Sequence, residues 1–232
     1  MLTVERLKAG YGPAQVLFGV SFGVGRGEVV TLLGRNGMGK TTTIRTLMGL
    51  VRARGGSATF EGEELTVLPP YRIAQRGLGL VPEGRMVFPT LTVEENLVAT
   101  AAARFGAARW TLSGVYALFP RLGERRTHMG DQLSGGEQQM LAIGRALMTN
   151  PKLLILDEAT ECLAPLIRGE IWSCLQALKR EGQAILLVDK HIDALEKIAD
   201  RHVVIEKGHV VWTGTSAELV ADPGVRTRYL QV

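Results

Sequence analysis

A glycine-rich loop between a buried-strand pattern and a helix constrains the fold of this chain more than any other feature. Residues 29–33 read Val-Val-Thr-Leu-Leu, a short run typical of a buried strand. The next residues, GRNGMGKTT from Gly34 to Thr42, fit the pattern G-x-x-x-x-G-K-[ST]. Backbone amides of such a loop converge on phosphate oxygens, and the following helix turns its positive end toward them. The sequence therefore predicts a phosphate site on an α/β fold.

Several residues of this phosphate loop (residues 34–42) have predicted individual roles. Lys40 is expected to reach the β- and γ-phosphates of a nucleotide, Thr41 to ligate Mg²⁺, and Thr42 to add a hydroxyl near the α-phosphate. A fortuitous glycine-rich turn is the alternative, but strand, loop and helix follow one another in the required order. The predicted nucleotide-binding residues here are Gly34, Arg35, Asn36, Gly37, Met38, Gly39, Lys40, Thr41 and Thr42.

Two adjacent carboxylates follow a second buried-strand pattern and are predicted to complete the metal site. The apolar run Leu153–Leu156 ends in Asp157 and Glu158. Asp157 suits Mg²⁺, directly or through a water molecule, and Glu158 suits a general base for an attacking water. The alternative is an acidic pair that caps the next helix, which is less favoured beside a phosphate loop.

Apolar runs rich in Val, Ile and Leu recur along the chain, and helical patterns separate most of them. This alternation predicts a parallel sheet with helices on its faces. The runs are Val29–Leu33, Leu78–Val81, Leu153–Leu156, Ala184–Val188 and Val203–Ile205. Three further runs near glycine-rich turns predict an antiparallel sheet beside it, at Leu2–Leu7, Gln15–Phe22 and Ser57–Phe60.

Two capping boxes predict helix starts between residues 88 and 150. Thr92 with Glu95 precedes an expected helix over Val93–Ala103, and Ser134 with Glu137 opens one that Asn150-Pro151 ends. We interpret residues 88–150 as a helical insert. The chain is then a single domain over residues 1–232, with a core formed by 1–87 and 151–232.

Composition and charge exclude several classes of protein. Hydrophobic residues make up 46% and charged residues 22%, which are ordinary globular values. No apolar run approaches the roughly 20 residues of a membrane helix, and no signal peptide is visible. Cys162 and Cys174 form neither a metal-binding pattern nor a disulfide framework. The net charge of +4 is interpreted as solvated surface, so no nucleic-acid partner is expected.

The string LSGGEQQ, residues 133–139, is the most specific feature. A capped helix start of this kind leaves backbone amides free to bind an anion. With the phosphate loop and the acidic strand end in this order, the string resembles the signature of the ATP-binding cassette (ABC) ATPases, over nearly the whole chain. The residues expected to bind nucleotide here are Ser134, Gly135, Gly136 and Glu137.

The resemblance implies a P-loop NTPase fold with a RecA-like parallel core, an antiparallel β subdomain and an inserted α-helical subdomain. It also implies hydrolysis of ATP to ADP and phosphate with Mg²⁺. Two cassettes sandwich two ATP molecules head to tail in this family, so the signature faces the γ-phosphate held by the other subunit.

Further roles follow from the resemblance one position at a time. Tyr11 resembles the aromatic residue that stacks on adenine, although a turn tyrosine is the alternative, and Val16 borders the ribose. Glu83 stands where many cassettes have glutamine and is expected to ligate Mg²⁺ or orient water. The register of the family's switch histidine falls on Lys190, with His191 one residue late. Both are candidates for the γ-phosphate contact, and His191 is favoured.

The loop after the acidic strand end departs from the family pattern. Ala164 occupies the place of an aspartate that bonds across the dimer, and Cys162 stands where glycine is expected. We interpret Cys162 as a small buried residue without a redox role.

Variants within these motifs resemble the Liv-type importer ATPases, which serve uptake of branched-chain amino acids. They are VPEGR at 81–85, LTVEENL at 91–97, and Leu-Ala-Pro at 163–165. The implied partners are a second ABC ATPase subunit, identical or different, two integral membrane permeases that contact residues 84–97, and indirectly a periplasmic or extracellular solute-binding protein. The chain is then expected at the cytoplasmic face of the inner or plasma membrane.

The sequence leaves three alternatives to this function open. The first is an importer ATPase for urea or short amides. The second is a soluble ABC ATPase that acts on DNA or ribosomes, although such proteins usually carry two cassettes or a long coiled-coil insert. A nucleotide kinase is a third, but it leaves the LSGGE string unexplained.

Overall fold

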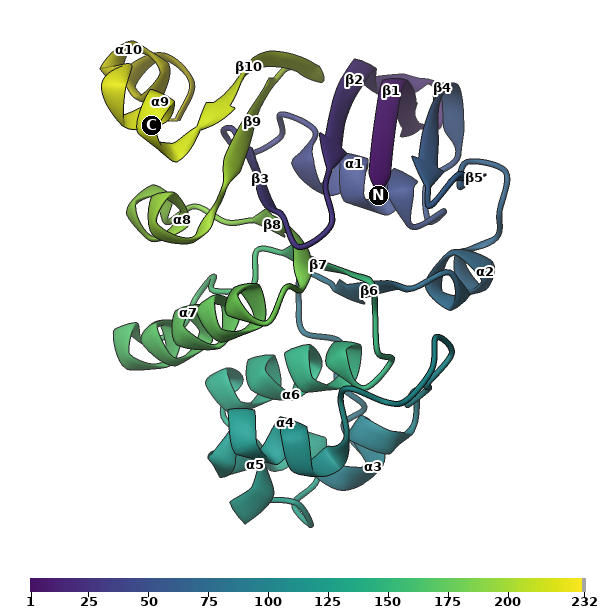
Figure 1. The fold of residues 1–232 in the computed structure, drawn as a ribbon, viewed down its shortest axis with the longest axis vertical. Coiled ribbons are helices and arrows are strands. Elements are labelled where there is room, and N and C mark those ends of the chain that lie inside the picture. Colours follow the sequence, from purple (N-terminus) through teal and green to yellow (C-terminus); the bar gives the residue numbers. More distant parts are fainter. Residues whose placement is uncertain (231–232) are drawn as a thin grey trace.

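The computed structural model describes residues 1–230, and a six-stranded sheet runs through its centre (Figure 1). The strand order is β10-β9-β3-β8-β7-β6, and all neighbours are parallel except the antiparallel pair of β10 with β9. A four-stranded antiparallel sheet of order β2-β1-β4-β5 lies beside it. The strands are β1 (Leu2–Tyr11), β2 (Ala14–Val24), β3 (Val29–Leu33), β4 (Ala53–Phe60), β5 (Glu63–Glu64), β6 (Leu78–Val81), β7 (Leu153–Asp157), β8 (Ala184–Val188), β9 (Arg201–Glu206) and β10 (His209–Thr215).

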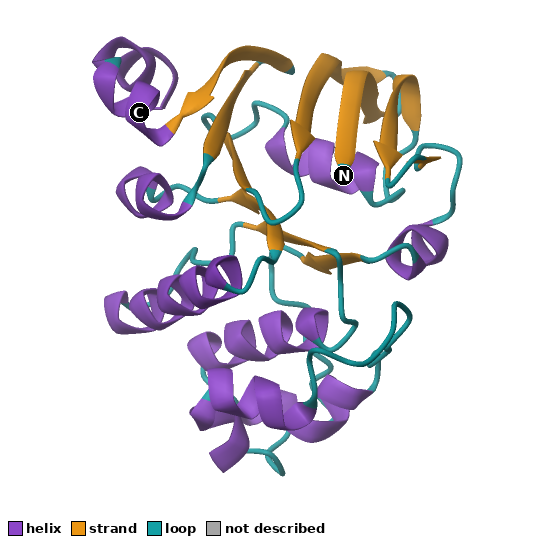
Figure 2. Cartoon of the chain, viewed as in Figure 1, coloured by secondary structure: helices purple, strands orange, loops and turns teal. Residues whose placement is uncertain are grey.

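The helices cover both faces of the central sheet, and α3 to α6 form an all-helical layer at one end of the molecule (Figure 2). Short 3₁₀ and π segments occupy Gly130–Gln132 and Arg226–Leu230. The helices are α1 (Lys40–Leu47), α2 (Pro70–Gln75), α3 (Val93–Val98), α4 (Leu112–Leu118), α5 (Pro120–Glu124), α6 (Gly135–Leu147), α7 (Pro165–Arg180), α8 (Ile192–Ile198), α9 (Ser216–Ala221) and α10 (Pro223–Val225). Among residues 1–230, no helix has the length and apolar character needed to cross a bilayer.

The central strands are buried on both faces, because every residue of β3, β7 and β8 lies in the interior. Alternate residues of β3 join different hydrophobic clusters. Val29 and Leu33 pack into the cluster that reaches the all-helical layer, whereas Val30 and Leu32 pack toward α1 and the antiparallel sheet. The alternation of side chains along a strand therefore joins three layers into one folded unit.

The predicted strands and both predicted capping boxes are confirmed. The predicted length of the helix after Thr92 is wrong, since α3 ends at Val98 and not at Ala103. The Ala102 amide donates to the carbonyl of Met148 at 3.0 Å, and the Asn150 side chain donates to the Ala102 carbonyl. The amide and carbonyl of Ala102 are therefore bonded to residues near the end of α6 and are not available to extend α3. Strand β10 had no predicted counterpart.

Candidate nucleotide site

The phosphate loop leaves the end of β3 and enters α1 through backbone conformations that favour glycine. Gly34, Gly37 and Gly39 have φ angles of 139°, 77° and 110°, all in the left-handed range. Gly39 is also the N-cap of α1. Only glycine adopts such angles without a steric penalty, and the result is a loop whose amides curve around one space.

Lys40, near the end of the phosphate loop, bonds back to the residues at its start. Its Nζ donates to the Gly34 carbonyl at 2.8 Å and to the Arg35 carbonyl at 2.9 Å. Burial lowers the pKa of this ammonium group, and the carboxylates of Glu158 and Asp157 oppose the shift. The cation is therefore held at the base of the loop, where a bound anionic phosphate would stabilise its charged form.

Asp157 lies beneath the loop at the end of β7. Thr41 Oγ1 donates to Asp157 Oδ1 at 3.2 Å, and burial raises the pKa of this carboxyl group. A hydroxyl and a carboxylate at this separation are hard oxygen ligands of the kind that Mg²⁺ takes together with phosphate oxygens. The residues present therefore fit the ion.

A pocket of about 290 Å³ opens above these residues. It brings together part of the phosphate loop, the two candidate catalytic glutamates and two residues from loops that follow β7 and β8. Its lining comprises Asn36, Gly37, Gly39, Lys40, Thr41, Thr42, Glu83, Glu158, Glu161 and Lys190.

The remaining residues of the phosphate loop anchor it from outside this pocket. The Gly34 and Arg35 carbonyls hold Lys40, as described above. The Met38 carbonyl accepts the amide of Gly208 at 3.0 Å, which ties the loop to the β9–β10 turn. Tyr11 ends β1, is 44% exposed, and places its hydroxyl oxygen 3.5 Å from Thr42 Oγ1. The aromatic ring thus lies at the rim of the phosphate loop.

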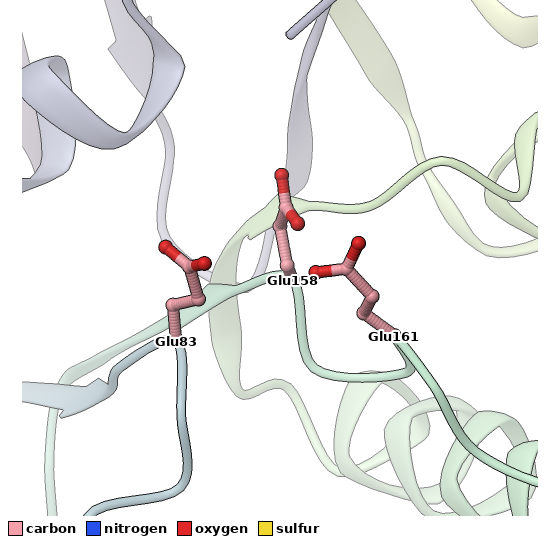
Figure 3. A group of neighbouring side chains, drawn as sticks. All are labelled: Glu83, Glu158 and Glu161. Carbon is pink, nitrogen blue, oxygen red and sulfur yellow. The ribbon is translucent and has the colours of Figure 1, made fainter.

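Three glutamates gather opposite the phosphate loop (Figure 3). Carboxylate oxygens of Glu83, Glu158 and Glu161 lie within 4.8 Å of one another. Burial, and after it the neighbouring Glu161, raise the pKa of Glu158 to about 7. A general base works best with a pKa near the working pH, so this environment suits the predicted role.

The backbone at Glu158 is strained. Its φ is 53°, in the left-handed region that side chains other than glycine rarely adopt. The Glu158 amide donates to the Val188 carbonyl at the end of β8, which holds this conformation in place. Strain of this kind is concentrated at functional sites.

Of the two candidates after β8, the structure places Lys190 in the pocket. Its Nζ lies 3.6 Å from Glu158 Oε2 and forms an ion pair with Glu161. His191 instead places Nδ1 2.7 Å from Asp189 Oδ1, and its Nε2 accepts from Arg168. Because both ring nitrogens are engaged, His191 is held in a structural network outside the pocket lining.

The signature residues lie apart from this pocket, at the start of α6. Ser134 caps the helix by accepting the Glu137 amide, and Glu137 Oε2 accepts the Ser134 amide at 2.8 Å. Glu137 Oε1 also pairs with Arg125 Nε at 2.9 Å. A Cβ placed at Gly136 would lie 2.6 Å from Ile167 Cγ2, so this glycine allows α7 to pack closely.

The expectation of a buried Cys162 is wrong, because the side chain is exposed. Its φ is 56°, the left-handed conformation for which glycine is the usual residue. The loop turns outward here, and Ala164 and Pro165 after it are exposed as well. The backbone therefore keeps the turn expected of a glycine while the thiol points to solvent.

The sequence analysis did not predict two residues of the site. Glu161 is three residues after Glu158 and shares its ion-pair partner Lys190. Arg85 is two residues after Glu83 and lies at the start of α6. Both residues could have been predicted, because each is a charged residue two or three positions after a predicted catalytic glutamate.

Comparison with known proteins identifies the family. The family model described as "ABC transporter" matches residues 17–161. The chain belongs to the ABC transporter family. This ABC ATPase has the P-loop fold of the family and hydrolyses ATP to drive transport, so it works in association with a membrane.

Relatives cover nearly its whole length. It is 46% identical over 234 residues to the high-affinity branched-chain amino acid transport ATP-binding protein BraG of Pseudomonas aeruginosa, covering 99% of each chain. It is 34% identical to the lipopolysaccharide export system ATP-binding protein LptB of Haemophilus influenzae, covering 99% of this chain and 97% of that one. A solved structure of an ATP-binding subunit of an ABC transporter aligns with a TM-score of 0.85 at 31% identity, covering 99% and 96% of the two chains.

Proposed function

We propose that this ABC ATPase powers an importer of branched-chain amino acids at the cytoplasmic face of the inner or plasma membrane. The identity of 46% to BraG over 99% of both chains carries the proposal. The likeness to LptB is weaker, at 34% over the same share of this chain, and it concerns an exporter.

The residues of the pocket divide the hydrolysis of ATP among them. The phosphate loop and Lys40 bind the triphosphate, and Thr41, Asp157 and Glu83 would hold Mg²⁺, which would offset phosphate charge. Glu158 takes a proton from water as the water oxygen bonds to the γ-phosphorus. The bond from that phosphorus to the ADP oxygen breaks, and ADP and phosphate leave. Lys190 contacts the γ-phosphate in place of the usual switch histidine.

A second cassette, identical or different, completes each site. The free amides at the start of α6 form an anion site that the pocket of the same chain does not include. In a head-to-tail pair, these amides cover the γ-phosphate of the opposing subunit. Residues 88–150 form the helical subdomain in this arrangement, and 1–87 with 151–232 form the core.

A groove of about 500 Å³ between α2, β6 and the all-helical layer suits a cytoplasmic helix of a permease. Tyr71 and Phe88 line it and are 60% and 41% exposed. Arg145 lies over the Phe88 ring at 4.8 Å and adds positive charge. Aromatic side chains and arginine are enriched in protein interfaces, so this groove supports contact with one permease subunit, and the two cassettes of the proposed pair supply one groove for each of two permeases.

Reconstitution tests the proposed substrate. The chain is assembled in proteoliposomes with two permeases and a solute-binding protein encoded beside it, and phosphate release is measured. Leucine-loaded binding protein is expected to stimulate hydrolysis, and Glu158→Gln in the same vesicles is expected to abolish it. Stimulation by urea or a short amide but not by leucine would replace the proposed substrate. Stimulation by lipopolysaccharide alone would overturn the direction of transport.

A further inference from the structure

Arg85 places a guanidinium group over the first turn of the signature helix α6. A Cβ at Gly135 would lie 2.7 Å from Arg85 Nη1 and 3.0 Å from Nη2, so the group is in close contact with the helix start. Its hydrogen bond to Gln138 Oε1 is long, at 3.4 Å. Within residues 1–230, no carboxylate forms an ion pair with Arg85.

The start of α6 carries one carboxylate, Glu137, which pairs with the Ser134 amide and with Arg125 and not with Arg85. The amino end of a helix carries partial positive charge, which favours anions and disfavours cations. Here the guanidinium and the free amides are positive on the same side. A single anion between them would interact favourably with both, and a phosphate accepts paired hydrogen bonds from arginine.

Hydrogen bonds to two neighbouring helices hold the backbone around Arg85 in place. Arg145 donates a hydrogen bond to the Met86 carbonyl, at 2.6 Å. Two residues later, the buried Asn96 side chain accepts the Phe88 amide at 2.8 Å and donates to its carbonyl at 2.9 Å. The loop from 83 to 88 is thus anchored to α3 and α6 behind the arginine.

The same loop reaches two different places. Glu83 lines the pocket of its own chain, whereas Arg85 lies at the signature, which is outside that pocket. In the proposed head-to-tail pair, the start of α6 faces the nucleotide of the opposing cassette. Two residues of one short loop would then touch two different nucleotides.

We propose that Arg85 binds the γ-phosphate held by the opposing cassette, together with the free amides of Gly135 and Gly136. The inference rests on the proposed head-to-tail pairing and adds a residue to it. Through Glu83 and Arg85, the loop from 83 to 88 connects the two nucleotide sites of the dimer.

Dimerisation in solution tests this role. In the Glu158→Gln background, which is expected to retain ATP, the dimer dissociation constant is measured with Mg²⁺ and ATP by sedimentation. Arg85→Gln is expected to raise that constant at least about tenfold, because each removed contact is charge-assisted. Arg85→Lys keeps the charge and is expected to lose less. Arg126→Gln, at an exposed arginine of the all-helical layer, is the matched control and is expected to leave the constant unchanged.

Nucleotide binding by the monomer separates the contact across the dimer from a contact within one chain. At protein concentrations below dimerisation, all four proteins are expected to bind a fluorescent ATP analogue equally well and to share one thermal midpoint. Equal dimerisation of Arg85→Gln and its parent would overturn the inference while leaving the pairing intact. Weaker ATP binding by monomeric Arg85→Gln would overturn it too. A parent that stays monomeric would instead refute self-pairing, and with it the inference as applied to two copies of this chain.

Discussion

Replacing Lys190 by alanine tests the candidate site most sharply, because the adjacent His191 supplies its control. Lys190 lines the pocket and lies 3.6 Å from Glu158, whereas His191 is engaged by Asp189 and Arg168. A hydrogen bond to a charged group contributes about 1.5 to 3 kcal/mol. Since about 1.4 kcal/mol corresponds to tenfold in rate, Lys190→Ala is expected to lower kcat for ATP hydrolysis by about 10- to 150-fold.

The two variants differ in which quantity they change. Lys190→Ala is expected to leave KM for ATP nearly unchanged, since Lys40 and the loop amides remain, and Lys190→Arg is expected to retain part of the rate. His191→Ala removes the acceptor of Arg168 and is expected to cost about 1 to 3 kcal/mol of stability, with kcat within a few-fold of the parent. Phosphate release and urea unfolding measure the two effects. A large loss of kcat in His191→Ala, with Lys190→Ala close to the parent, would refute this assignment.

Substitutions at three further residues test the fold around the site. Cys162→Gly relieves a left-handed backbone and is expected to add up to about 1 kcal/mol of stability, or about 2 to 4 °C in thermal midpoint, whereas Cys162→Val is expected to lower it. Asn96→Ala leaves buried loop groups unpaired and is expected to cost about 2 to 4 kcal/mol in urea unfolding; a cost below about 1 kcal/mol would contradict the anchoring role. Burial lowers the pKa of His202 to about 4, so the folded chain binds fewer protons than the unfolded one and loses stability as pH falls from about 6.5 to 4. His202→Gln is expected to remove on the order of 2 to 3 kcal/mol of that loss, measured as the difference in unfolding free energy between pH 7 and pH 4.5.

Local sequence patterns predicted most of the central sheet, because parallel strands buried on both faces read as continuous apolar runs. The inward positions of strand β10 are only half-buried except at Gly214, and the strand pairs with β9 through the short turn at Lys207 and Gly208, which the sequence analysis did not use. The end of α3 depends on Ala102, which bonds to residues near the end of α6. This contact of Ala102 is not visible in a local pattern.

The phosphate loop and the capping boxes were predictable because their geometry depends on neighbours in sequence. The choice between Lys190 and His191 depended on where Asp189 and Arg168 lie, which only the folded chain shows. Cys162 was expected inside because cysteine is among the most buried residue types, but its left-handed turn directs the thiol outward. Arg85 reaches α6 from 50 residues upstream of Gly135, beyond any local signal.

The shared hydrophobic cluster between the central sheet and the all-helical layer limits how these parts can move. Leu97 and Val115 of the helical layer pack in the same cluster as Leu154 of β7 and Ile171 of α7. At Gly144 of α6, a Cβ would lie 2.8 Å from Val115 Cγ1, so the helices are in close contact there. A wide hinge swing would expose this interior to water. We therefore expect any displacement of the layer during turnover to occur as small sliding steps between interlocked side chains, a shear in which the apolar surface stays covered.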